Sequence, residues 1–258
     1  VHSQRQSKKA AQPLSIKIED KQDCPLYTAK IIKDVNVGLS PDWLKKRLEL
    51  VGCRSVNNIV DITNYILFEW GEPLHAFDLD KLRGESIIVR RARRDETITT
   101  IDDQKRILTP EILVIADKEK AVALAGIMGG KESEVKESTK NILLEAAVFN
   151  PTVIRRGRRK LGIQSESAYR FERGVDAGII ENASGRAAQL IQQLSNGRYV
   201  LAKSAGSYKI KHKLINLDVS MVHKILGVNI TASKIKTILN NLGFKLKAKT
   251  KNLFLVDI

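Results

Sequence analysis

The sequence predicts a mixed α+β fold. Short runs in which apolar and polar residues alternate, as in residues 14–18, indicate half-buried strands. Longer segments in which apolar residues recur every three or four positions, as in residues 43–51, indicate helices that bury one face. The chain has 258 residues, 43% of them hydrophobic and 5% aromatic, so it can bury a core built mainly of Ile, Leu, Val and Ala.

The composition narrows the class of protein. Lys and Arg number 44 against 29 Asp and Glu, a net charge of +15, which favours a polyanionic partner such as nucleic acid; a lysine-rich genome would give the same balance. The two cysteines, Cys24 and Cys53, form no CxxC motif and join no histidine cluster, which excludes a disulfide scaffold and argues against a metal site. No apolar run approaches the ~18 residues of a membrane helix, so no membrane partner is expected.

The first elements follow in order from residue 1. Residues 1–13 are polar and basic without periodicity, which predicts a linker. Strands are expected at residues 14–18 and 26–35. Residues 40–42 (Ser-Pro-Asp) combine the capping residue, the proline and the first-turn acid that begin a helix, and Gly52 ends it.

A second helix and a strand-rich region come next. The helix is expected to be capped by Ser55 and to reach about Glu69, with an apolar stripe formed by Val56, Ile59, Val60, Thr63 and Leu67. Strands are then expected at residues 87–90, 97–101, 113–116, 121–127 and 141–149, and Gly129-Gly130 breaks the fourth of them.

Two helices complete the first domain, which is predicted to span residues 14–205. Asn150-Pro151 begins a helix that runs to about Lys160. A longer helix is expected over residues 175–194, where Asn196-Gly197 stops it.

A second, smaller domain is expected over residues 212–258. Its elements are a strand at 214–217, a helix capped by Ser220 and ended by Gly227, a short strand at 228–230, a helix at 232–242 capped by Thr231, and a hairpin of 244–248 and 253–256. This β-α-β-α-β-β order suggests a winged-helix-like domain, and residues 211–258 carry nine lysines and two aspartates. Because the chain begins with Val1 and ends within a strand pattern, we expect a fragment, with this domain truncated at its C-terminus.

Glu145 is the least expected residue type for its place. It lies in an apolar strand segment, where burying a carboxylate is costly unless it is paired. Alternation puts it on the face of Leu143 and Ala147, and the opposite face, with Leu144 and Ala146, is equally apolar. Two readings follow: an ion pair with an arginine at the strand end, or a pocket carboxylate that accepts a hydrogen bond from a ligand.

His75 and three glycines are weaker candidates. His75 follows a Gly-Glu-Pro turn, and a lone histidine is more often structural than functional. Gly126, Gly129 and Gly130 form a G-x-x-G-G pattern, which matches no nucleotide-phosphate loop. They therefore indicate either a tight turn or a place where the backbone approaches a ligand closely.

A basic run and a serine-containing loop follow in the sequence. The run comprises five cations, Arg155, Arg156, Arg158, Arg159 and Lys160, which cannot all share one helix face; phosphate binding and a solvated face are both open. The loop Ser165-Glu166-Ser167 says little alone, and no Gly-x-Ser-x-Gly elbow is present to indicate a serine hydrolase of that type.

Four strings, in this order, resemble the beta subunit of bacterial-type phenylalanyl-tRNA synthetases. They are NNIVDITNYILFEWGEPLHAFDLDKL (57–82), LAGIMGG (124–130), NILLEAAVFNP (141–151) and RRKLGIQSESAYRFERGVD (158–176). The resemblance covers about residues 25–258. It implies a tRNA-editing domain with mixed, largely antiparallel sheets and packed helices, followed by the start of a winged-helix-like domain.

The resemblance also implies a site that hydrolyses tyrosine mischarged on the phenylalanine tRNA. The family's pocket residues fall on Asn64 and His75, expected to be catalytic, and on Gly126 and Glu145, expected to bind substrate. The threonine and alanine of the family's Thr-x-Ala loop fall on Ser165 and Ser167, and both are departures. Glu145 would accept a hydrogen bond from the tyrosine phenol, and the five cations of residues 155–160 would bind nucleic acid.

The mechanism implied by the resemblance needs an activated water. His75 is the expected general base or water-orienting group, since its unperturbed pKa lies near neutral pH, and Asn64 would orient the substrate or the water. An equally open reading gives His75 a positioning role only, with a ribose hydroxyl of the tRNA assisting.

For the whole enzyme, the resemblance implies ATP and magnesium, with neither site in this segment. It implies a synthetase alpha subunit as partner, in a heterotetramer of two alpha and two beta subunits, along with the phenylalanine tRNA. The expected location is the cytoplasm, with an organelle such as the plastid as the alternative. Two other functions stay open: a free-standing aminoacyl-tRNA deacylase, or a non-catalytic tRNA- or DNA-binding module.

Overall fold

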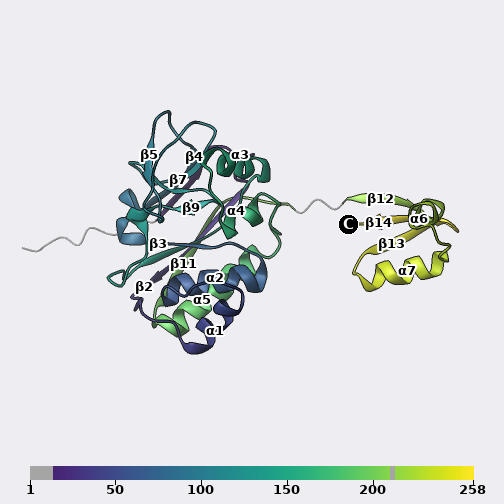
Figure 1. The fold of residues 1–258 in the computed structure, drawn as a ribbon, viewed down its shortest axis with the longest axis horizontal. Helices are drawn as coiled ribbons and strands as arrows, with labels where there is room; N and C mark the ends of the chain where they lie inside the picture. The colour runs from purple at the N-terminus through teal and green to yellow at the C-terminus, as the bar shows by residue number, and fades with distance from the viewer. Residues whose placement is uncertain (1–13, 210–212) are drawn as a thin grey trace, which may run out of the picture. The chain divides into compact units, whose positions relative to one another are not determined.

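A computed structural model describes residues 14–209 and 213–258 (Figure 1). The chain divides into two units, with the boundary between Tyr208 and Lys209, and each is described by itself. The linker expected over residues 1–13 lies outside the described residues.

A four-stranded antiparallel sheet forms the centre of the first unit. Its strands, in spatial order, are β11 (Arg198–Gly206), β2 (Leu26–Lys33), β10 (Ile142–Val148) and β3 (His75–Asp78). All seven residues of β10 are buried, because the strand lies between two neighbours and both faces of the sheet are covered. In this register Glu145 stands opposite Ala29 on one side and opposite His75 on the other.

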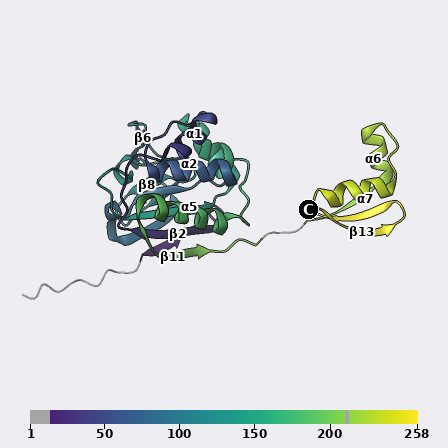
Figure 2. The same ribbon diagram turned by 90° about the horizontal axis from the view of Figure 1, so that it is seen from below.

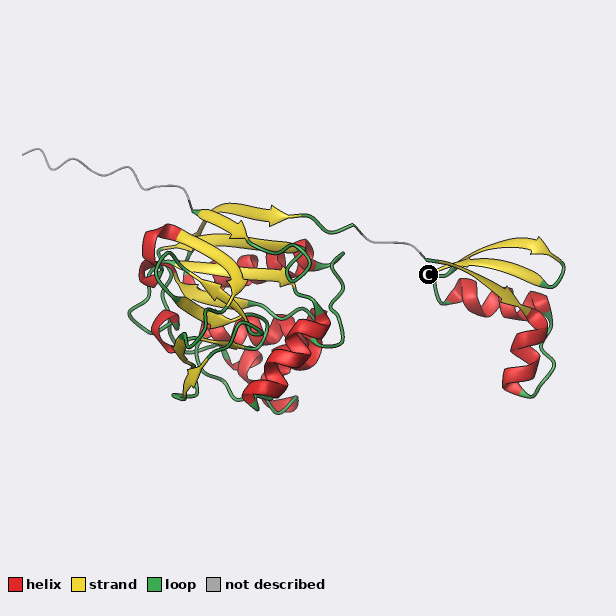
Figure 3. Cartoon of the chain, turned by 90° about the horizontal axis from the view of Figure 1, so that it is seen from above, coloured by secondary structure: helices red, strands yellow, loops and turns green. Residues whose placement is uncertain are grey.

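A five-stranded sheet packs on one face of this central sheet, and Figure 3 shows the strands in layers. It contains β1 (Ser15–Ile18), β4 (Ser86–Arg91), β7 (Leu113–Ala116), β8 (Ala121–Leu124) and β9 (Met128–Gly129) in that order. Only β1 and β4 pair in parallel. The core between the two sheets includes Tyr27 and Leu143 from one and Val89, Val114 and Leu124 from the other.

Helices cover the other face of the central sheet, as Figure 2 shows for α1 (Asp42–Leu50), α2 (Asn58–Trp70) and α5 (Ile180–Ser195). They bury Ile62, Ile66 and Ile191 against Ile32 and Leu144 of the sheet. Smaller elements complete the unit: α3 (Pro151–Leu161), α4 (Glu166–Phe171), the ribbon of β5 (Thr97–Thr99) and β6 (Lys105–Ile107), and three single 3₁₀ turns at Leu79–Lys81, Arg83–Glu85 and Lys131–Ser133.

The second unit is a three-stranded antiparallel sheet with two helices. The sheet order is β12 (Leu214–Asp218), β14 (Leu253–Asp257) and β13 (Lys245–Thr250). Helices α6 (Val219–Leu226) and α7 (Ala232–Asn241) pack on it through a small core of Val219, Ile235, Phe254 and Val256.

The predicted fold class, mixed α+β with largely antiparallel sheets, is confirmed, and several local predictions are wrong. Asn57, and not Ser55, caps α2, accepting hydrogen bonds from the N–H groups of Ile59 and Val60. The predicted apolar stripe is confirmed at Ile59, Thr63 and Leu67, which are buried. It is wrong at Val56, which is 60% exposed, and it omits Ile62 and Ile66, which are fully buried.

Other elements also differ from the expectation. The helix expected from residue 175 begins at Ile180. Asp218, and not Ser220, caps α6, because its carboxylate accepts from both the N–H and the hydroxyl of Ser220. Residues 228–230 form no strand, since the carbonyl of Ile230 instead bonds the His223 ring.

Candidate functional site

A cavity of about 340 Å³ lies in the first unit among α2, β3, the β8–β9 turn, β10 and the start of α4. All six pocket residues expected from the sequence line it: Asn64, His75, Gly126, Glu145, Ser165 and Ser167. Apolar side chains such as Leu67, Leu124 and Phe171 make up much of the remaining wall. We call this the Glu145 cavity.

Glu145 occupies the middle of the central strand and is only 6% exposed. The hydroxyl of Tyr27 donates to its Oε2 at 2.7 Å. Tyr27 and Ala29 lie two residues apart on β2, on the face that Glu145 shares, so the pair is a diagonal cross-strand contact. Of the two readings of Glu145, the ion pair with an arginine is not formed within residues 14–209 and 213–258, where its side-chain partner is Tyr27.

The environment of Glu145 favours the neutral acid. Burial raises the pKa of Glu145 to about 7, although the hydrogen bond from Tyr27 acts in the opposite direction. Burial therefore opposes the ionised carboxylate that would form a charge-assisted hydrogen bond with a phenol. A ligand that donates a hydrogen bond would shift it towards the anion.

His75 faces Glu145 directly across the β3–β10 ladder. Its ring meets the Phe77 ring edge-on, with centroids 4.4 Å apart, and its buried Nε2 has no hydrogen-bond partner among the described residues. Burial lowers the pKa of His75 to about 4, so the imidazole is neutral at pH 7. A Cβ on Gly129 would come 2.4 Å from His75 Cε1, which explains why glycine stands there.

Gly126 and Asn64 border the same cavity. Gly126 has φ of +64°, and a Cβ there would come 2.9 Å from the Phe149 ring. Its N–H binds no acceptor in the described part of the chain, so it is available to a ligand. Asn64 projects into the cavity from α2, the helix whose buried face packs on the central sheet.

Both serines hold the loop around Gly126 against α4. Ser165 caps α4 by accepting from the Ala168 N–H at 3.1 Å, and it donates to the Ile127 carbonyl at 2.7 Å. Ser167 donates to the Gly126 carbonyl at 3.2 Å. The hydroxyl that departs from the family pattern at Ser167 is therefore bound to the protein itself.

The five cations of residues 155–160 do not share one helix face, as predicted: two form ion pairs with glutamates and three are exposed to solvent. Arg158 turns towards Glu172, with Nη2 3.1 Å from Oε1, and Lys160 pairs with Glu111 at 2.5 Å. Arg155, Arg156 and Arg159 are exposed. The structure brings none of these five side chains into the Glu145 cavity.

Glu72 is a buried acid that the sequence did not single out. It is 0% exposed, and neither carboxylate oxygen has a hydrogen-bond partner among the described residues. Burial, with smaller contributions from Asp176 and Glu145, raises the pKa of Glu72 to about 8. An acid between glycine and proline in a turn is usually solvated, so no sequence signal distinguishes it. Tyr27 was missed because its partner lies 118 positions away.

The described residues contain neither a cluster of metal-binding side chains nor a helix that could span a membrane. In residues 14–209 and 213–258, no three His, Cys, Asp or Glu side chains gather where a metal ion could be held. Within those same ranges, no helix has both the length and the apolar content to cross a bilayer.

A sequence model of the B3/4 domain matches residues 23–196, so the chain belongs to the B3/4 domain family. Among curated proteins it is similar to phenylalanine–tRNA ligase beta subunits, which confirms the resemblance noted from the four strings. The subunit from Geobacter metallireducens is 48% identical over 243 residues, covering 93% of this chain and 30% of the relative. That from Bacillus subtilis is 46% identical over 240 residues, covering 92% and 30%.

The chain spans about 30% of the length of these relatives. Among solved structures it is similar to an N-terminal fragment of the phenylalanyl-tRNA synthetase beta-subunit from Pyrococcus horikoshii. The TM-score is 0.47 and the identity 12%, over 96% of this chain and 70% of that chain.

Proposed function

We propose that the chain is the editing segment of a phenylalanine–tRNA ligase beta subunit and hydrolyses tyrosyl-tRNA formed in error on the phenylalanine tRNA. One observation supports this above all others. Asn64, His75, Gly126 and Glu145 come from separate parts of the sequence, yet they line one largely apolar cavity.

Discrimination rests on the hydroxyl that separates tyrosine from phenylalanine. Tyr27 engages Oε2 of Glu145, which leaves Oε1 for the substrate phenol, and the free N–H of Gly126 can donate to the phenol oxygen. A charge-assisted hydrogen bond is worth about 1.5–3 kcal/mol. Phenylalanine offers no such group, so it would desolvate Glu145 without compensation.

Hydrolysis requires a water held at the ester carbonyl. The neutral His75 ring has an unpartnered Nε2 and can accept a hydrogen bond from that water. With its pKa lowered to about 4, His75 is a weak base, which favours orienting the water over full proton removal. Asn64 would orient the ester from the side of α2.

The remaining features belong to the whole protein. We propose that it acts with a synthetase alpha subunit in a heterotetramer and charges the phenylalanine tRNA with the help of ATP and magnesium. The ATP and magnesium sites are proposed to belong to the parts of the enzyme that the resemblance assigns to charging the tRNA. The proposed location is the cytoplasm, as is usual for translation enzymes.

The test is Glu145→Gln, which retains the shape of the side chain and can still accept from Tyr27. Release of tyrosine and of phenylalanine from the charged phenylalanine tRNA would be measured on the intact protein. We expect the preference for tyrosine to fall about tenfold, the difference between a charge-assisted and a neutral hydrogen bond. Glu137→Gln, at an exposed loop position, is the matched control.

Equal losses for both esters would reject the hydroxyl-reading role of Glu145. No hydrolysis of either ester by the unmodified protein, together with salt-dependent RNA binding, would instead favour the non-catalytic binding module.

A further inference from the structure

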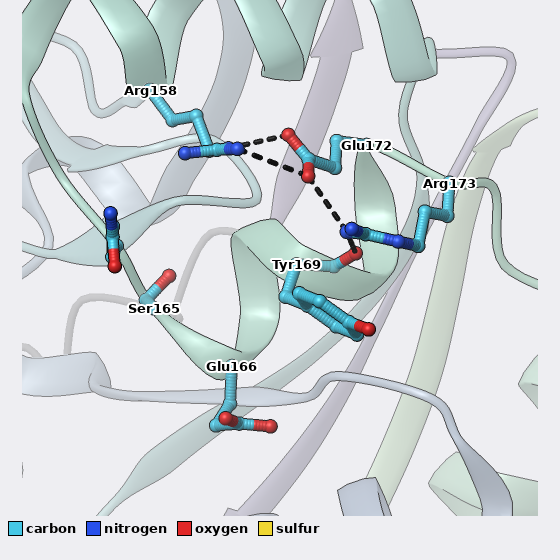
Figure 4. Close-up of a pocket in the computed structure, with 7 residues that line it drawn as sticks. Arg158, Ser165, Glu166, Tyr169, Glu172 and Arg173 are labelled. Atoms are coloured by element: carbon cyan, nitrogen blue, oxygen red, sulfur yellow. Dashed lines mark hydrogen bonds and ion pairs between the residues drawn. The ribbon is translucent and has the colours of Figure 1, made fainter.

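A second cavity, of about 530 Å³, adjoins the Glu145 cavity (Figure 4). Arg158 lines it from α3, and residues 164–166, Tyr169, Glu172 and Arg173 line it from α4 and its flanks. Ser165 and Glu166 line both cavities, so the two lie side by side. We call the second one the Tyr169 cavity.

The charges of the Tyr169 cavity leave cationic donors free. Arg158 and Arg173 both bind Glu172, so two guanidinium groups share one carboxylate. Arg158 uses Nε and Nη2 for this contact and Arg173 uses Nη1, so in the described part of the chain the other guanidinium nitrogens bind no protein group. Glu166 is neutralised by Arg170 at 2.6 Å. The remaining single positive charge matches one phosphodiester.

The cavity also presents a flat aromatic surface. The guanidinium of Arg173 stacks on the Tyr169 ring, 3.6 Å from the ring centroid. Tyr169 nevertheless remains 56% exposed. Figure 4 shows Arg173 covering one side of the ring. The uncovered side can take a nucleobase, because single-stranded RNA is commonly held by stacking on aromatic rings and arginine planes.

We propose that the Tyr169 cavity binds the nucleotide that precedes the esterified terminal nucleotide of the tRNA. Its base stacks on Tyr169, and its phosphate is bound by the free nitrogens of Arg158 and Arg173. This rests on the proposed function, since the terminal nucleotide then carries its amino acid into the neighbouring Glu145 cavity. A base and a phosphate together explain both the stacked ring and the spare charge, whereas an acidic peptide would use only the charge.

The experiment compares two esters on the intact protein. One is tyrosyl-tRNA, and the other is tyrosyl-adenosine, which has the ester but no preceding nucleotide. For Tyr169→Ala we expect KM for tyrosyl-tRNA to rise about tenfold, the effect of losing one stacked base, with kcat unchanged. KM for tyrosyl-adenosine should stay the same, and Tyr169→Phe, which retains the ring, should match the unmodified protein.

A binding measurement separates this proposal from the hydrolytic one. Fluorescence anisotropy with a short single-stranded RNA ending in CCA should show binding that Tyr169→Ala weakens about tenfold and that Tyr169→Phe preserves. If neither ester is hydrolysed, the proposed editing function is wrong. The anisotropy measurement then still tests whether the Tyr169 cavity binds RNA. An equal KM change for both esters, no change for either, or tighter binding of an acidic peptide than of RNA would overturn the proposal.

Discussion

The Glu145 cavity and the Tyr169 cavity share two lining residues but treat charge in opposite ways. In the first, Glu145 and His75 face each other across a strand ladder, and burial drives both towards their neutral forms. In the second, Glu172 is ionised between two arginines, and the hydrogen bond from Arg158 lowers the pKa of Glu172. In the Glu145 cavity the loss of solvation decides the protonation state of the titratable groups, whereas in the Tyr169 cavity ion pairing decides it.

Under the proposed function and the further inference, this contrast suits the two cavities to different tasks. Neutral, partly unsatisfied groups suit a place where a substrate completes the hydrogen bonding. Paired charges at the surface suit a place that holds a polyanion without changing protonation state. The first should therefore control the rate and selectivity of hydrolysis, and the second the affinity for RNA.

The largest expected effect is on the hydrolytic rate. His75→Ala should lower kcat for tyrosyl-tRNA by about 10²-fold, the lower end of the range for an acid–base or water-orienting group. KM should change little, in contrast to Tyr169→Ala. Single-turnover release of tyrosine measures the step. Because the pKa of His75 is lowered to about 4 and that of Glu145 is raised to about 7, an inflection of the rate near neutral pH should come from Glu145 and should be absent from Glu145→Gln.

A matched variant retains the His75 imidazole but displaces it. Gly129→Ala would place a Cβ against His75 Cε1, so kcat should fall although the histidine is still present. An unchanged rate in His75→Ala would remove the histidine from the mechanism.

The second effect concerns stability and pH. The pKa of Glu72 is raised to about 8, so its protonated form stabilises the fold at low pH, and this contribution is lost as the pH rises from about 4.5 through 8. The contribution of His75 is common to variant and parent, and that of Glu145 differs only by its repulsion with Glu72, a smaller cause of the raised pKa than burial. Glu72→Gln should therefore raise the free energy of unfolding at pH 8.5 by up to about 4 kcal/mol, and by much less at pH 5.

Urea unfolding at the two pH values measures this difference. Glu137→Gln serves again as the exposed control and should leave the pH dependence unaltered. A Glu72→Gln effect of the same size at both pH values would show that the carboxyl is not protonated by burial.

The smallest effect is expected at the wall between the two cavities. Ser167→Ala removes the hydrogen bond to the Gly126 carbonyl, so the free energy of unfolding should fall by about 0.5–1.5 kcal/mol, with tyrosine release nearly unchanged. Ser165→Ala loses a helix cap and a second bond, so it should cost more. A large change in selectivity for Ser167→Ala would place that hydroxyl against the substrate instead.

The sequence was informative where one residue contradicted its neighbours. Glu145 could be singled out because an acid inside an apolar strand demands a partner or a ligand, and the strand itself was predicted to within a residue at each end. The identity of its partner, Tyr27, was not accessible, since the β2–β10 register that joins them is set by tertiary packing. The resemblance named the residues of the Glu145 cavity, and no periodicity could have grouped them.

Local competition explains the errors in the helices. Ser55 and Asn57 are both good capping residues, but the Ser55 hydroxyl is directed to the Asp61 carboxylate, whereas Asn57 Oδ1 lies within reach of the N–H groups of Ile59 and Val60. The same competition placed the cap of α6 at Asp218 rather than Ser220. Glu72 was inaccessible because only the packed fold shows that its turn is buried.

His75 and Glu145 face each other across one strand ladder. This pairing restricts which insertions and deletions related sequences can accept. Gly71 to Leu74 connect α2 to β3, and His75 is the first residue of that strand. Adding or deleting a single residue in this connection would slide β3 by one step and turn the imidazole towards the helical layer. Relatives can therefore exchange side chains around the hollow with little disruption, but the length of this short connection is expected to be inherited unchanged.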